Sequence, residues 1–457
     1  PLSFRLAKAA ETDDQRADTI HALGNPQVKT PTLDRLVESG FVFRNAYVMG
    51  SNVGAVCLPS RNMLLSGRAY FRFHPDAALG KATRAYASPD RPNFPDSMKG
   101  AGYVTYHHGK QGNVARQIHP RFDHTGYVKH YAMDPKSPYP EEPGKEIFDA
   151  AIAFLTERSD DRPFFMYLAP SCPHDPRVAA ARYMRMYDRS SIPLPANYMP
   201  LHPFDNGEQV IRDELLAPWP RTEAEIRRHL HDYYAVITAM DGHFARLLQT
   251  LKDLGQYDNT IVIFSSDNGL AVGSHGLMGK QSLYEHSTKV PLVFAGPGIP
   301  QGQSDALCYL LDIFPTVCDL VEAPMPEGLD GQSLAPVIEG DAAKVRDTLF
   351  TSYRDCQRAV RDGRWKLLRY PLINHTQLFD LAADPDEMHN LADDPAQAER
   401  IERMTQWIER WQRRLGDQVS LTSATAAEFE FIPPRGEALD AILKGWRMDR
   451  SRNRLPR

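Results

Sequence analysis

Residues 233–268 read YYAVITAMDGHFARLLQTLKDLGQYDNTIVIFSSDN and contain two patterns in succession. Apolar side chains recur from Tyr233 to Leu251 at the spacing of one helix face, and Gly255 provides a stop. Residues 260–264 follow at once and are almost wholly apolar, which is typical of a strand buried on both faces of a parallel sheet. A helix followed directly by such a strand predicts a doubly wound α/β core.

Other apolar runs repeat the pattern of a short buried strand that ends in a loop able to carry functional side chains. They cover residues 103–106, 163–169 and 290–295, and they lead into Gly109-Lys110, His174 and Gly296-Pro297-Gly298, respectively. A helix over residues 30–40, which opens with Thr-Pro and stops at a glycine, alternates with them.

The N-terminal segment fits this sheet poorly. Residues 3–12 contain Lys8, Glu11 and several alanines in place of the large apolar side chains of a buried strand. Burying a charged side chain is costly unless that side chain is paired. We therefore expect the first strand to be short, shifted or unusually exposed.

The pattern of expected helices and strands changes after about residue 340. Asp362-Gly363 lies between two extended runs, which predicts a hairpin, and a helix is expected from Asp394-Pro395 to Gly416. The prediction is therefore a large doubly wound, mainly parallel sheet between helices over residues 1–340. A smaller C-terminal α+β subdomain with a short antiparallel sheet and a basic tail follows over residues 341–457.

Composition narrows the class of protein. The 457 residues carry a net charge of −5, so the basic footprint of a nucleic-acid-binding protein is absent and no nucleic-acid partner is expected. No apolar stretch reaches the roughly 18 residues of a membrane-spanning helix, so no membrane span is expected. The five cysteines are irregularly spaced, which argues against a disulfide framework and leaves Cys57 as the thiol of most interest.

The segment Cys57-Leu-Pro-Ser-Arg61-Asn-Met-Leu-Leu-Ser-Gly67-Arg68 carries the strongest chemical signal. Pro59 suits the first turn of a helix, which puts Cys57 at the positive end of the helix dipole, and Arg61 adds a full charge. A cysteine in this setting is expected to have a lowered pKa and high reactivity. The alternative is a core cysteine followed by an arginine on the helix surface.

This segment resembles the signature of the type I, formylglycine-dependent sulfatases, which belong to the alkaline-phosphatase-like superfamily. The resemblance rests on Cys57, Pro59, Ser60, Arg61, Gly67 and Arg68. It implies that a formylglycine-generating maturation enzyme oxidises Cys57 to formylglycine, whose hydrated aldehyde is the nucleophile.

Two acidic segments on either side of the cysteine motif resemble the metal-binding segments of the same family. Asp13 and Asp14 precede the motif, and Asp267 and Asn268 follow it. Together with Cys57, they are implied to bind one divalent cation, with Ca²⁺ favoured over Mg²⁺ among the metals that prefer hard oxygen ligands. Taken alone, either pair more commonly forms a turn or a helix cap.

Two further loops resemble the segments that contact sulfate in the family. The resemblance implies that Lys280 binds the sulfate, whereas His275 in the same loop either touches the substrate or stabilises the loop. His174, in a Pro-His motif, is implied to protonate the leaving oxygen, a role that suits a neutral-range pKa. Asp175 and Arg177 are expected to contact the substrate.

Residues 109–113, Gly-Lys-Gln-Gly-Asn, depart from the family pattern at one position. By resemblance, Lys110 is expected to stabilise the aldehyde hydrate together with Arg61, and Gln111 is expected to contact the substrate. Gly112, however, stands where the family has a histidine that is associated with the formylglycine hydroxyl and with release of sulfate.

Three explanations for the missing histidine remain open. Another histidine can take its place, the candidates being His107, His108 and His119. Asn113 can instead orient a water molecule. The third explanation, which we favour, is that a metal-bound hydroxyl is acidic enough to need no base, so that Gly112 changes only the shape of the pocket.

The resemblance runs from about Asp13 to about Leu391 and implies a sulfatase that hydrolyses sulfate monoesters. A sulfated carbohydrate is the favoured substrate, because the long irregular segment 190–222 contains 202–207 and 219–221, whose polar and aromatic residues can line a sugar cleft. The alternatives are a phosphonate or phosphate monoester hydrolase or an arylsulfatase on the same scaffold, and a glycan-binding relative without activity. The family also implies a periplasmic or secreted location, although no signal peptide is recognised and a cytoplasmic location stays open.

Overall fold

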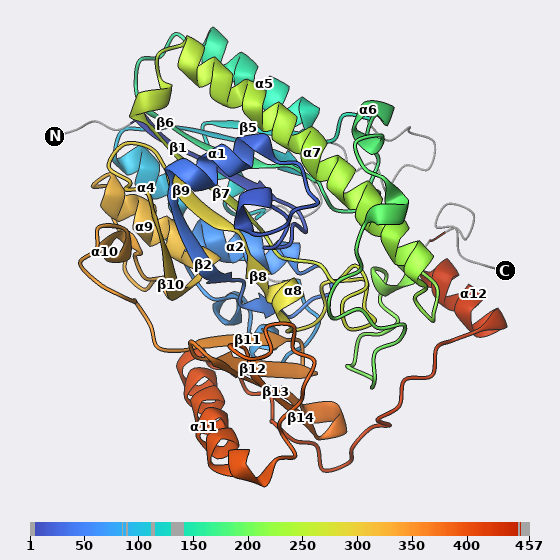
Figure 1. The fold of residues 1–457 in the computed structure, drawn as a ribbon. Coiled ribbons are helices and arrows are strands. Elements are labelled where there is room, and N and C mark those ends of the chain that lie inside the picture. The colour runs from blue at the N-terminus through green and yellow to red at the C-terminus, as the bar shows by residue number, and fades with distance from the viewer. Residues whose placement is uncertain are drawn as a thin grey trace.

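Figure 1 shows the fold as a computed structural model, which describes residues 5–84, 86–87, 90–110, 115–128, 141–446 and 448. Within these residues, a nine-stranded sheet lies at the centre in the order β10-β2-β9-β7-β1-β6-β4-β5, with β8 paired to β2. Its strands are β1 (Arg5–Thr12), β2 (Phe41–Tyr47), β4 (Val104–Lys110), β5 (His124–Val128), β6 (Phe164–Ala169), β7 (Thr260–Ser266), β8 (Lys289–Val290), β9 (Leu292–Ala295) and β10 (Gly302–Tyr309). The large α/β sheet expected from the sequence is confirmed.

The direction of β9 differs from the expectation. The neighbouring strands β7, β1, β6, β4 and β5 all run parallel, whereas β9 pairs antiparallel with both β7 and β2. The carboxyl end of β9 therefore lies at the opposite edge of the sheet from theirs, and Gly296 approaches Thr260 at the start of β7. The loop at Gly296-Pro-Gly does not join the loops that follow the parallel strands.

The first strand is central and eight residues long, so the expectation of a short strand is wrong, whereas its pairing with β7 does shift register between Leu6 and Lys8. β1 pairs in parallel with β6 on one side and β7 on the other, and Glu11 is buried. The Glu11 carboxylate accepts a hydrogen bond from the hydroxyl of Tyr167 on β6. Backbone pairing on both sides holds the strand in the sheet, and this bond gives one of the two Glu11 carboxylate oxygens a partner.

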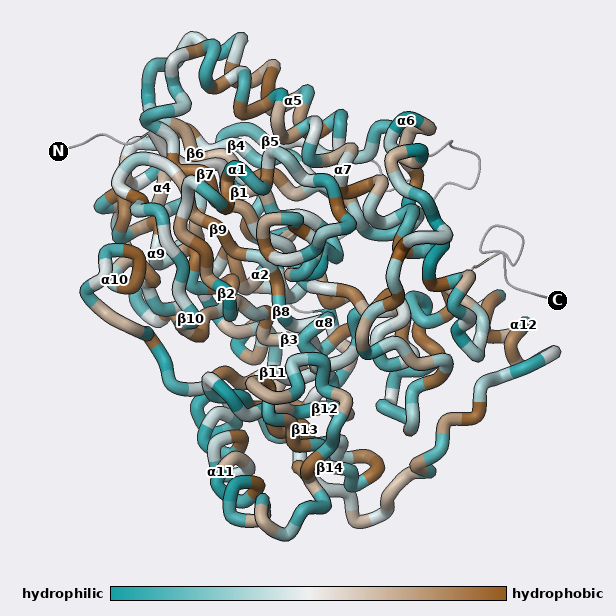
Figure 2. The backbone as a smooth tube through the Cα atoms, in the orientation of Figure 1, coloured by the Kyte–Doolittle hydropathy of each residue, from teal (hydrophilic) through white to brown (hydrophobic). Residues whose placement is uncertain are grey.

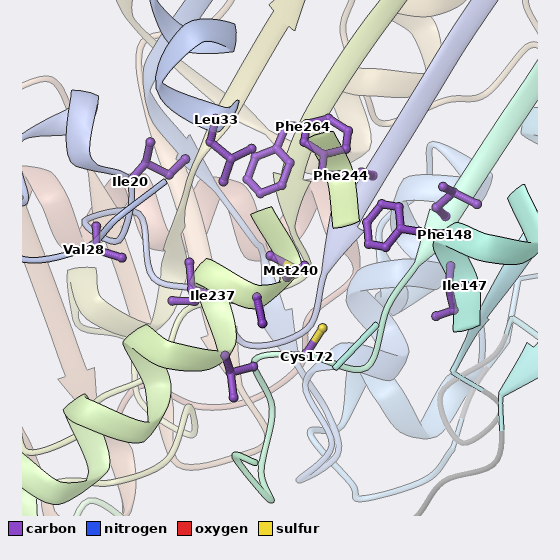
Figure 3. Close-up of a cluster of buried hydrophobic side chains, with 14 of the residues drawn as sticks. Ile20, Val28, Leu33, Ile147, Phe148, Cys172, Ile237, Met240, Phe244 and Phe264 are labelled. Atoms are coloured by element: carbon purple, nitrogen blue, oxygen red, sulfur yellow. The ribbon is translucent and has the colours of Figure 1, made fainter. Parts of the chain in front are cut away.

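One face of the sheet is covered by α1 (Pro31–Ser39), α5 (Lys145–Glu157) and α7 (Glu223–Asp253), and α5 and α7 cross the upper part of Figure 1. Figure 3 shows the core beneath them, where Phe244 of α7 packs against Phe264 of β7 and Phe148 of α5. Cys172 is buried in the same core, so it anchors the loop that carries His174.

The opposite face is covered by α2 (Cys57–Ser66), α4 (Phe94–Gly100), α9 (Ile313–Leu320) and α10 (Ala335–Ile338). Phe165 and Tyr167 of β6 point to this side, whereas Phe164, Met166 and Leu168 point to the first core. Burial on both sides explains why the strands are continuously apolar, and Figure 2 shows the hydrophobic colours concentrated along the central strands such as β9.

A second, five-stranded sheet forms within the described residues, in the order β14-β13-β12-β11-β3. Its strands are β3 (Gly50–Ser51), β11 (Leu349–Tyr353), β12 (Gln357–Arg361), β13 (Trp365–Tyr370) and β14 (His375–Asp380). The hairpin expected at Asp362-Gly363 joins β12 to β13, and α11 (Ala398–Leu415) ends at Gly416, whose φ is +80°. Because β3 comes from the N-terminal part of the chain, the second sheet is tied to the first, and the domain boundary at residue 340 stays a prediction.

Two sequence expectations concern the whole chain. All five cysteines are free and buried. In the part of the chain that the structure describes, no helix has both the length and the apolar character needed to cross a membrane.

Candidate active site

The candidate residues lie at the carboxyl edge of the parallel strands. Asp13 and Asp14 follow β1, Lys110 ends β4, and Asp267 and Asn268 follow β7. Parallel strands end at one edge of a sheet, which is where α/β proteins commonly bind ligands. The fold therefore explains why segments more than 250 residues apart in the chain meet.

Cys57 is the first residue of α2 and is fully buried at this edge. Its Sγ atom lies 3.1 Å from Oδ1 of Asp13, 3.5 Å from Oδ1 of Asp14 and 3.9 Å from Oδ1 of Asn268. The ammonium group of Lys280 lies 3.0 Å from the same sulfur. The thiol is thus surrounded by oxygen atoms, with one cation in contact.

The donor set fits a divalent cation. Ligand atoms of Asp13, Asp14, Cys57 and Asp267 all lie within 4.8 Å of one another, and all four residues are buried. The Nδ2 atom of Asn268 donates hydrogen bonds to Asp14 and Asp267, at 2.7 and 2.9 Å, which fixes its amide beside the carboxylates. Carboxylate and amide oxygens are the ligands that Ca²⁺ and Mg²⁺ prefer.

The backbone of Asp14 has an unusual conformation. Its φ is +67°, a left-handed conformation that is uncommon outside glycine. Its N–H donates to Oδ1 of Asp267 at 3.1 Å, and its carbonyl accepts from the hydroxyl of Tyr233 on α7. Such backbone strain is held by its surroundings and clusters at functional sites.

Three buried cations balance the three carboxylates. Lys110 lies 2.6 Å from Asp13, Lys280 lies 2.5 Å from Asp14, and Nε of Arg61 donates to Asp267 at 2.8 Å. Burial opposes the ionisation of Asp13, but Lys110, His174 and Arg61 outweigh it and hold the pKa of this carboxyl well below its usual value. Burial and the neighbouring Asp13 raise the pKa of Asp267 to about 7, against the opposing effect of Arg61.

The expected lowering of the Cys57 pKa is wrong. The helix N-terminus and Arg61 predicted an acidic thiol, yet burial, Asp13 and Asp267 raise the pKa of Cys57 well above its usual value. Arg61 donates to Asp267 and lies 3.7 Å from Asp13, and no hydrogen bond among the described residues joins it to the sulfur. The surroundings of residue 57 are therefore those of a carboxylate cluster, which a sequence-local argument could not include.

His174 lies on the loop after β6, and its two nitrogens face different partners. Its Nε2 atom is 3.7 Å from Oδ2 of Asp14, and its Nδ1 atom is 2.6 Å from the carbonyl oxygen of Asp175 and 3.4 Å from that residue's carboxylate. Burial and Lys110 lower the pKa of His174, while Asp14 and Asp175 raise it. The ring thus presents Nε2 to the cluster and is held from behind by Asp175.

Arg212 and Asp213 join the site although the sequence did not single them out. Arg212 binds the carboxylate of Asp175 with both terminal nitrogens, and its Nη1 also lies 2.9 Å from Asp213. Asp213 accepts a hydrogen bond of 2.8 Å from the side chain of Gln281, next to Lys280. The only signal in the sequence was the irregular segment 190–222, which suggested other residues.

Arg177 lies on the same loop as His174 but binds protein groups of its own. Its Nη1 atom is 3.2 Å from Nδ1 of His229, its Nε donates to the carbonyl of Pro173, and its guanidinium lies 5.2 Å from the ring centroid of Tyr233. Its Nη2 atom is buried and has no hydrogen-bond partner. A role of Arg177 or Asp175 in substrate binding stays a prediction.

His275 lies away from these contacts. Its ring stacks on Tyr284 at 4.0 Å, and its Nε2 atom is 3.1 Å from the carbonyl oxygen of Glu387. This is the position of a histidine that stabilises its loop, the alternative to substrate contact, and the substrate role stays a prediction.

The stretches suggested for a sugar cleft contain both buried residues, such as His202 and Arg221, and exposed ones, such as Pro203 and Pro220. His202 bonds the carbonyl of His275, and Arg221 pairs with Glu214 at 2.7 Å. His202 and Arg221 are 2% and 1% exposed, so they do not line an open surface. A contact of residues 202–207 or 219–221 with a sugar stays a prediction.

Gln111, Gly112 and Asn113 lie outside the described residues. Of the alternative bases, His107 bonds the carbonyl of Tyr167 at 3.0 Å, and its ring lies 4.0 Å from that of His119. His108 faces the hydroxyl of Tyr106. No hydrogen bond among the described residues joins His107, His108 or His119 to Cys57, and the way in which the chain manages without the family histidine stays a prediction.

The comparison with protein families gives two matches. The model of the family described as Sulfatase matches residues 12–323, a range that contains Asp13, Asp14, Cys57, Asp267 and Lys280. The model described as N-sulphoglucosamine sulphohydrolase, C-terminal, matches residues 273–414.

Individual proteins resemble the chain over most of its length. An N-acetylglucosamine-6-O-sulfatase of Bacteroides thetaiotaomicron is 26% identical, over 89% of this chain and 86% of the relative. A structure solved in complex with its substrate, D-glucosamine-2-N,6-O-disulfate, is 23% identical with a TM-score of 0.75, over 91% of this chain and 99% of the other. The phosphonate monoester hydrolase of Agrobacterium radiobacter is 21% identical with a TM-score of 0.72, over 94% and 99%.

Proposed function

The chain belongs to the sulfatase family and is a sulfuric ester hydrolase, and from this we propose that it removes sulfate from a sulfated carbohydrate. The observation that carries the proposal is the position of Cys57 at the start of a helix, among three buried carboxylates and in contact with Lys280. A thiol needs none of these carboxylates for packing. They suit a residue that works beside a cation.

We propose that the cation is bound by Asp13, Asp14, Asp267 and Asn268, with residue 57 as its neighbour. Ca²⁺ is favoured over Mg²⁺, because the donors come from separate loops and Ca²⁺ accepts irregular oxygen coordination more readily. With Cys57 converted to formylglycine, the cation and the aldehyde hydrate would together supply an activated hydroxyl nucleophile. The conversion requires a formylglycine-generating enzyme as a partner during maturation.

The cations around the cluster are the proposed sulfate-binding groups. A sulfate monoester is anionic, and positive groups fixed before reaction stabilise the charge that spreads over its oxygens in the transition state. Lys280 reaches both Asp14 and Cys57, so its ammonium group lies where a sulfate on residue 57 would be held. Lys110 and Arg61 hold Asp13 and Asp267 and thereby fix the carboxylates.

His174 is the proposed proton donor to the leaving oxygen. Its Nδ1 is held by Asp175, which leaves Nε2 directed toward the cluster. A sugar alkoxide is a poor leaving group, so protonation by a positioned histidine contributes about 10²–10⁴-fold to such a reaction. This requirement is weaker for an aryl sulfate, whose phenolate leaves more easily.

The choice of a carbohydrate is supported by the relatives. The N-acetylglucosamine-6-O-sulfatase and the enzyme solved with a glucosamine disulfate both act on sulfated sugars by name, and both cover most of the chain. The competing function is phosphonate monoester hydrolysis, which is suggested by the fold shared with phosphonate monoester hydrolases such as that of Agrobacterium radiobacter.

The test is a panel of defined sulfated mono- and oligosaccharides, assayed for released sulfate with protein co-expressed with a formylglycine-generating enzyme. Phenyl sulfate and a phenyl phosphonate monoester are assayed beside them. We expect the largest kcat/KM on one of the sulfated sugars. A larger kcat/KM on the phosphonate than on every sulfate ester would contradict the proposal and favour the competing function.

A further inference from the structure

The pair Arg212–Asp213 connects His174 and Lys280, which both lie beside Asp14. Through Asp175, Arg212 reaches His174, and through Gln281, Asp213 reaches Lys280. Both members lie in the segment 190–222, which is distant in the sequence from each of the loops that they contact. Their contacts with the site run through other side chains.

The first connection fixes the imidazole. The guanidinium of Arg212 binds both carboxylate oxygens of Asp175, with Nη1 2.8 Å from Oδ1. The same Oδ1 lies 3.4 Å from Nδ1 of His174, whose Nε2 faces Asp14. A bidentate arginine restricts a carboxylate in both position and plane, so it also restricts the ring behind which that carboxylate lies.

The second connection fixes the loop of Lys280. Asp213 accepts from Nε2 of Gln281 at 2.8 Å, and Oε1 of Gln281 accepts the backbone N–H of Lys280 at 2.9 Å. Gln281 also donates to the carbonyl of Gly54, three residues before Cys57. Gln281 is only 4% exposed, so few alternative partners are within reach.

We propose that Arg212 and Asp213 are positioning residues, Arg212 for sulfate esters with poor leaving groups and Asp213 for every sulfate ester. Arg212 holds His174 in line with the leaving oxygen, and Asp213 holds Lys280 at the sulfate. The two effects differ in kind, because His174 acts on the leaving group and Lys280 on the group that every substrate shares. This inference rests on the proposed function for the roles of His174 and Lys280.

The kinetic test compares two aryl sulfates, phenyl sulfate and 4-nitrophenyl sulfate, since nitrophenolate leaves without much help. We expect Arg212→Ala to lower kcat by about 10–100-fold on phenyl sulfate and by less than about 3-fold on 4-nitrophenyl sulfate, with KM little changed. Arg212→Lys should recover part of the loss, because it keeps the charge but not the bidentate geometry. Asp213→Asn should raise KM and lower kcat to the same extent on both esters.

The matched control is Arg72→Ala. Arg72 also binds a carboxylate, that of Asp330, through two nitrogens at 2.6 Å, and its side chain is 39% exposed compared with 28% for Arg212. This control should leave the ratio of the two rates unchanged. An equal loss on both esters in Arg212→Ala, or the same change of ratio in Arg72→Ala, would overturn the positioning role.

A second measurement does not depend on turnover. In crystal structures of Arg212→Ala, we expect the His174 ring to leave its place beside Asp175, whereas in Arg72→Ala it should stay. A ring that keeps its orientation in Arg212→Ala would overturn the inference even if the enzyme is an active sulfatase. If no sulfate ester is hydrolysed by the wild type, the proposed function fails, and a displaced ring still supports the positioning role.

Discussion

Two clusters of buried charge lie in this molecule, and their internal arrangement differs. In the cluster that we call the structural cluster, Lys366 of β13 lies 3.0 Å from Glu285 and 2.7 Å from Glu387, and Arg361 lies 3.2 Å from Glu285. Each carboxylate there faces a cation, so the cluster ties the start of α8 (Glu285–Thr288) to the second sheet.

In the Cys57 cluster, formed by Asp13, Asp14, Cys57 and Asp267, the carboxylates face one another and the thiol. Each of these carboxylates also pairs with a cation, Lys110, Lys280 or Arg61, so the difference lies in the thiol on which the three carboxylates converge. Charge burial is common to both clusters and does not identify a site. Convergence of like charges on one side chain does identify a site, because the charges repel one another unless a further positive group binds among them.

The largest expected effect is the loss of kcat when residue 57 of the Cys57 cluster is replaced. We propose that residue 57 is the nucleophile of the converted enzyme, so Cys57→Ser should lower kcat on 4-nitrophenyl sulfate by about 10⁴-fold or more while substrate still binds. The midpoint of thermal unfolding should change little, since the two side chains are similar in size. Stopped assays for nitrophenol and a binding titration check this, and a kcat within tenfold of wild type would refute the role of residue 57.

The structural cluster should respond in the opposite way. Lys366→Met leaves Glu285 and Glu387 buried with one fewer cation, and breaking such a pair costs about 3–5 kcal/mol of unfolding free energy. Urea unfolding measures this loss, and kcat at a temperature where the variant is folded should stay at the wild-type level. Lys344→Met is the control, because Lys344 is 64% exposed and its pair with Asp347 contributes little. Loss of kcat in folded Lys366→Met would remove the distinction between the clusters.

Cation binding should distinguish the carboxylates of the two clusters. We expect Asp267→Asn to weaken binding of a divalent cation by more than about 10-fold, whereas Glu387→Gln should leave it unchanged. Calorimetric titration of chelator-treated protein with Ca²⁺ and then with Mg²⁺ measures both the loss and the preference. Equal affinities in Asp267→Asn and wild type would show that the cation lies elsewhere.

The smallest effect concerns the buried histidines behind the site. The His119 ring lies 4.0 Å from that of His107, and no hydrogen bond among the described residues joins it to Cys57, so His119→Ala should change kcat by less than about 3-fold, well below the contribution of a general base. Rapid-mixing experiments should show no burst of alcohol followed by slow turnover. A burst in His119→Ala, absent in His108→Ala, would identify His119 as the replacement for the histidine missing at Gly112.

Features whose signal is local in the chain could be predicted from the sequence. The apolar runs of β6 and β7, the hairpin at Asp362-Gly363 and the stop at Gly416 all appear where expected. The pairs Asp13-Asp14 and Asp267-Asn268 also meet, because both follow parallel strands and such strands end at one edge of the sheet.

Features that depend on pairing across the fold could not be predicted. β1 is central because β6 and β7 bind it on both sides, and β9 is antiparallel because of its neighbours, which its own residues do not specify. Arg212 reaches Asp175 from a segment without regular structure, so no periodicity points to it. The raised pKa of Cys57 likewise comes from burial in the folded chain and from Asp13 and Asp267, which are remote in sequence.

The central claim is that Cys57 acts as a converted residue at a cation-binding cluster. Its most direct test is peptide mass spectrometry of residue 57 in preparations with different specific activities, made with and without a formylglycine-generating enzyme. The account predicts that kcat per molecule rises in proportion to the fraction of aldehyde at position 57. Full activity in a preparation whose residue 57 is entirely free thiol would contradict it.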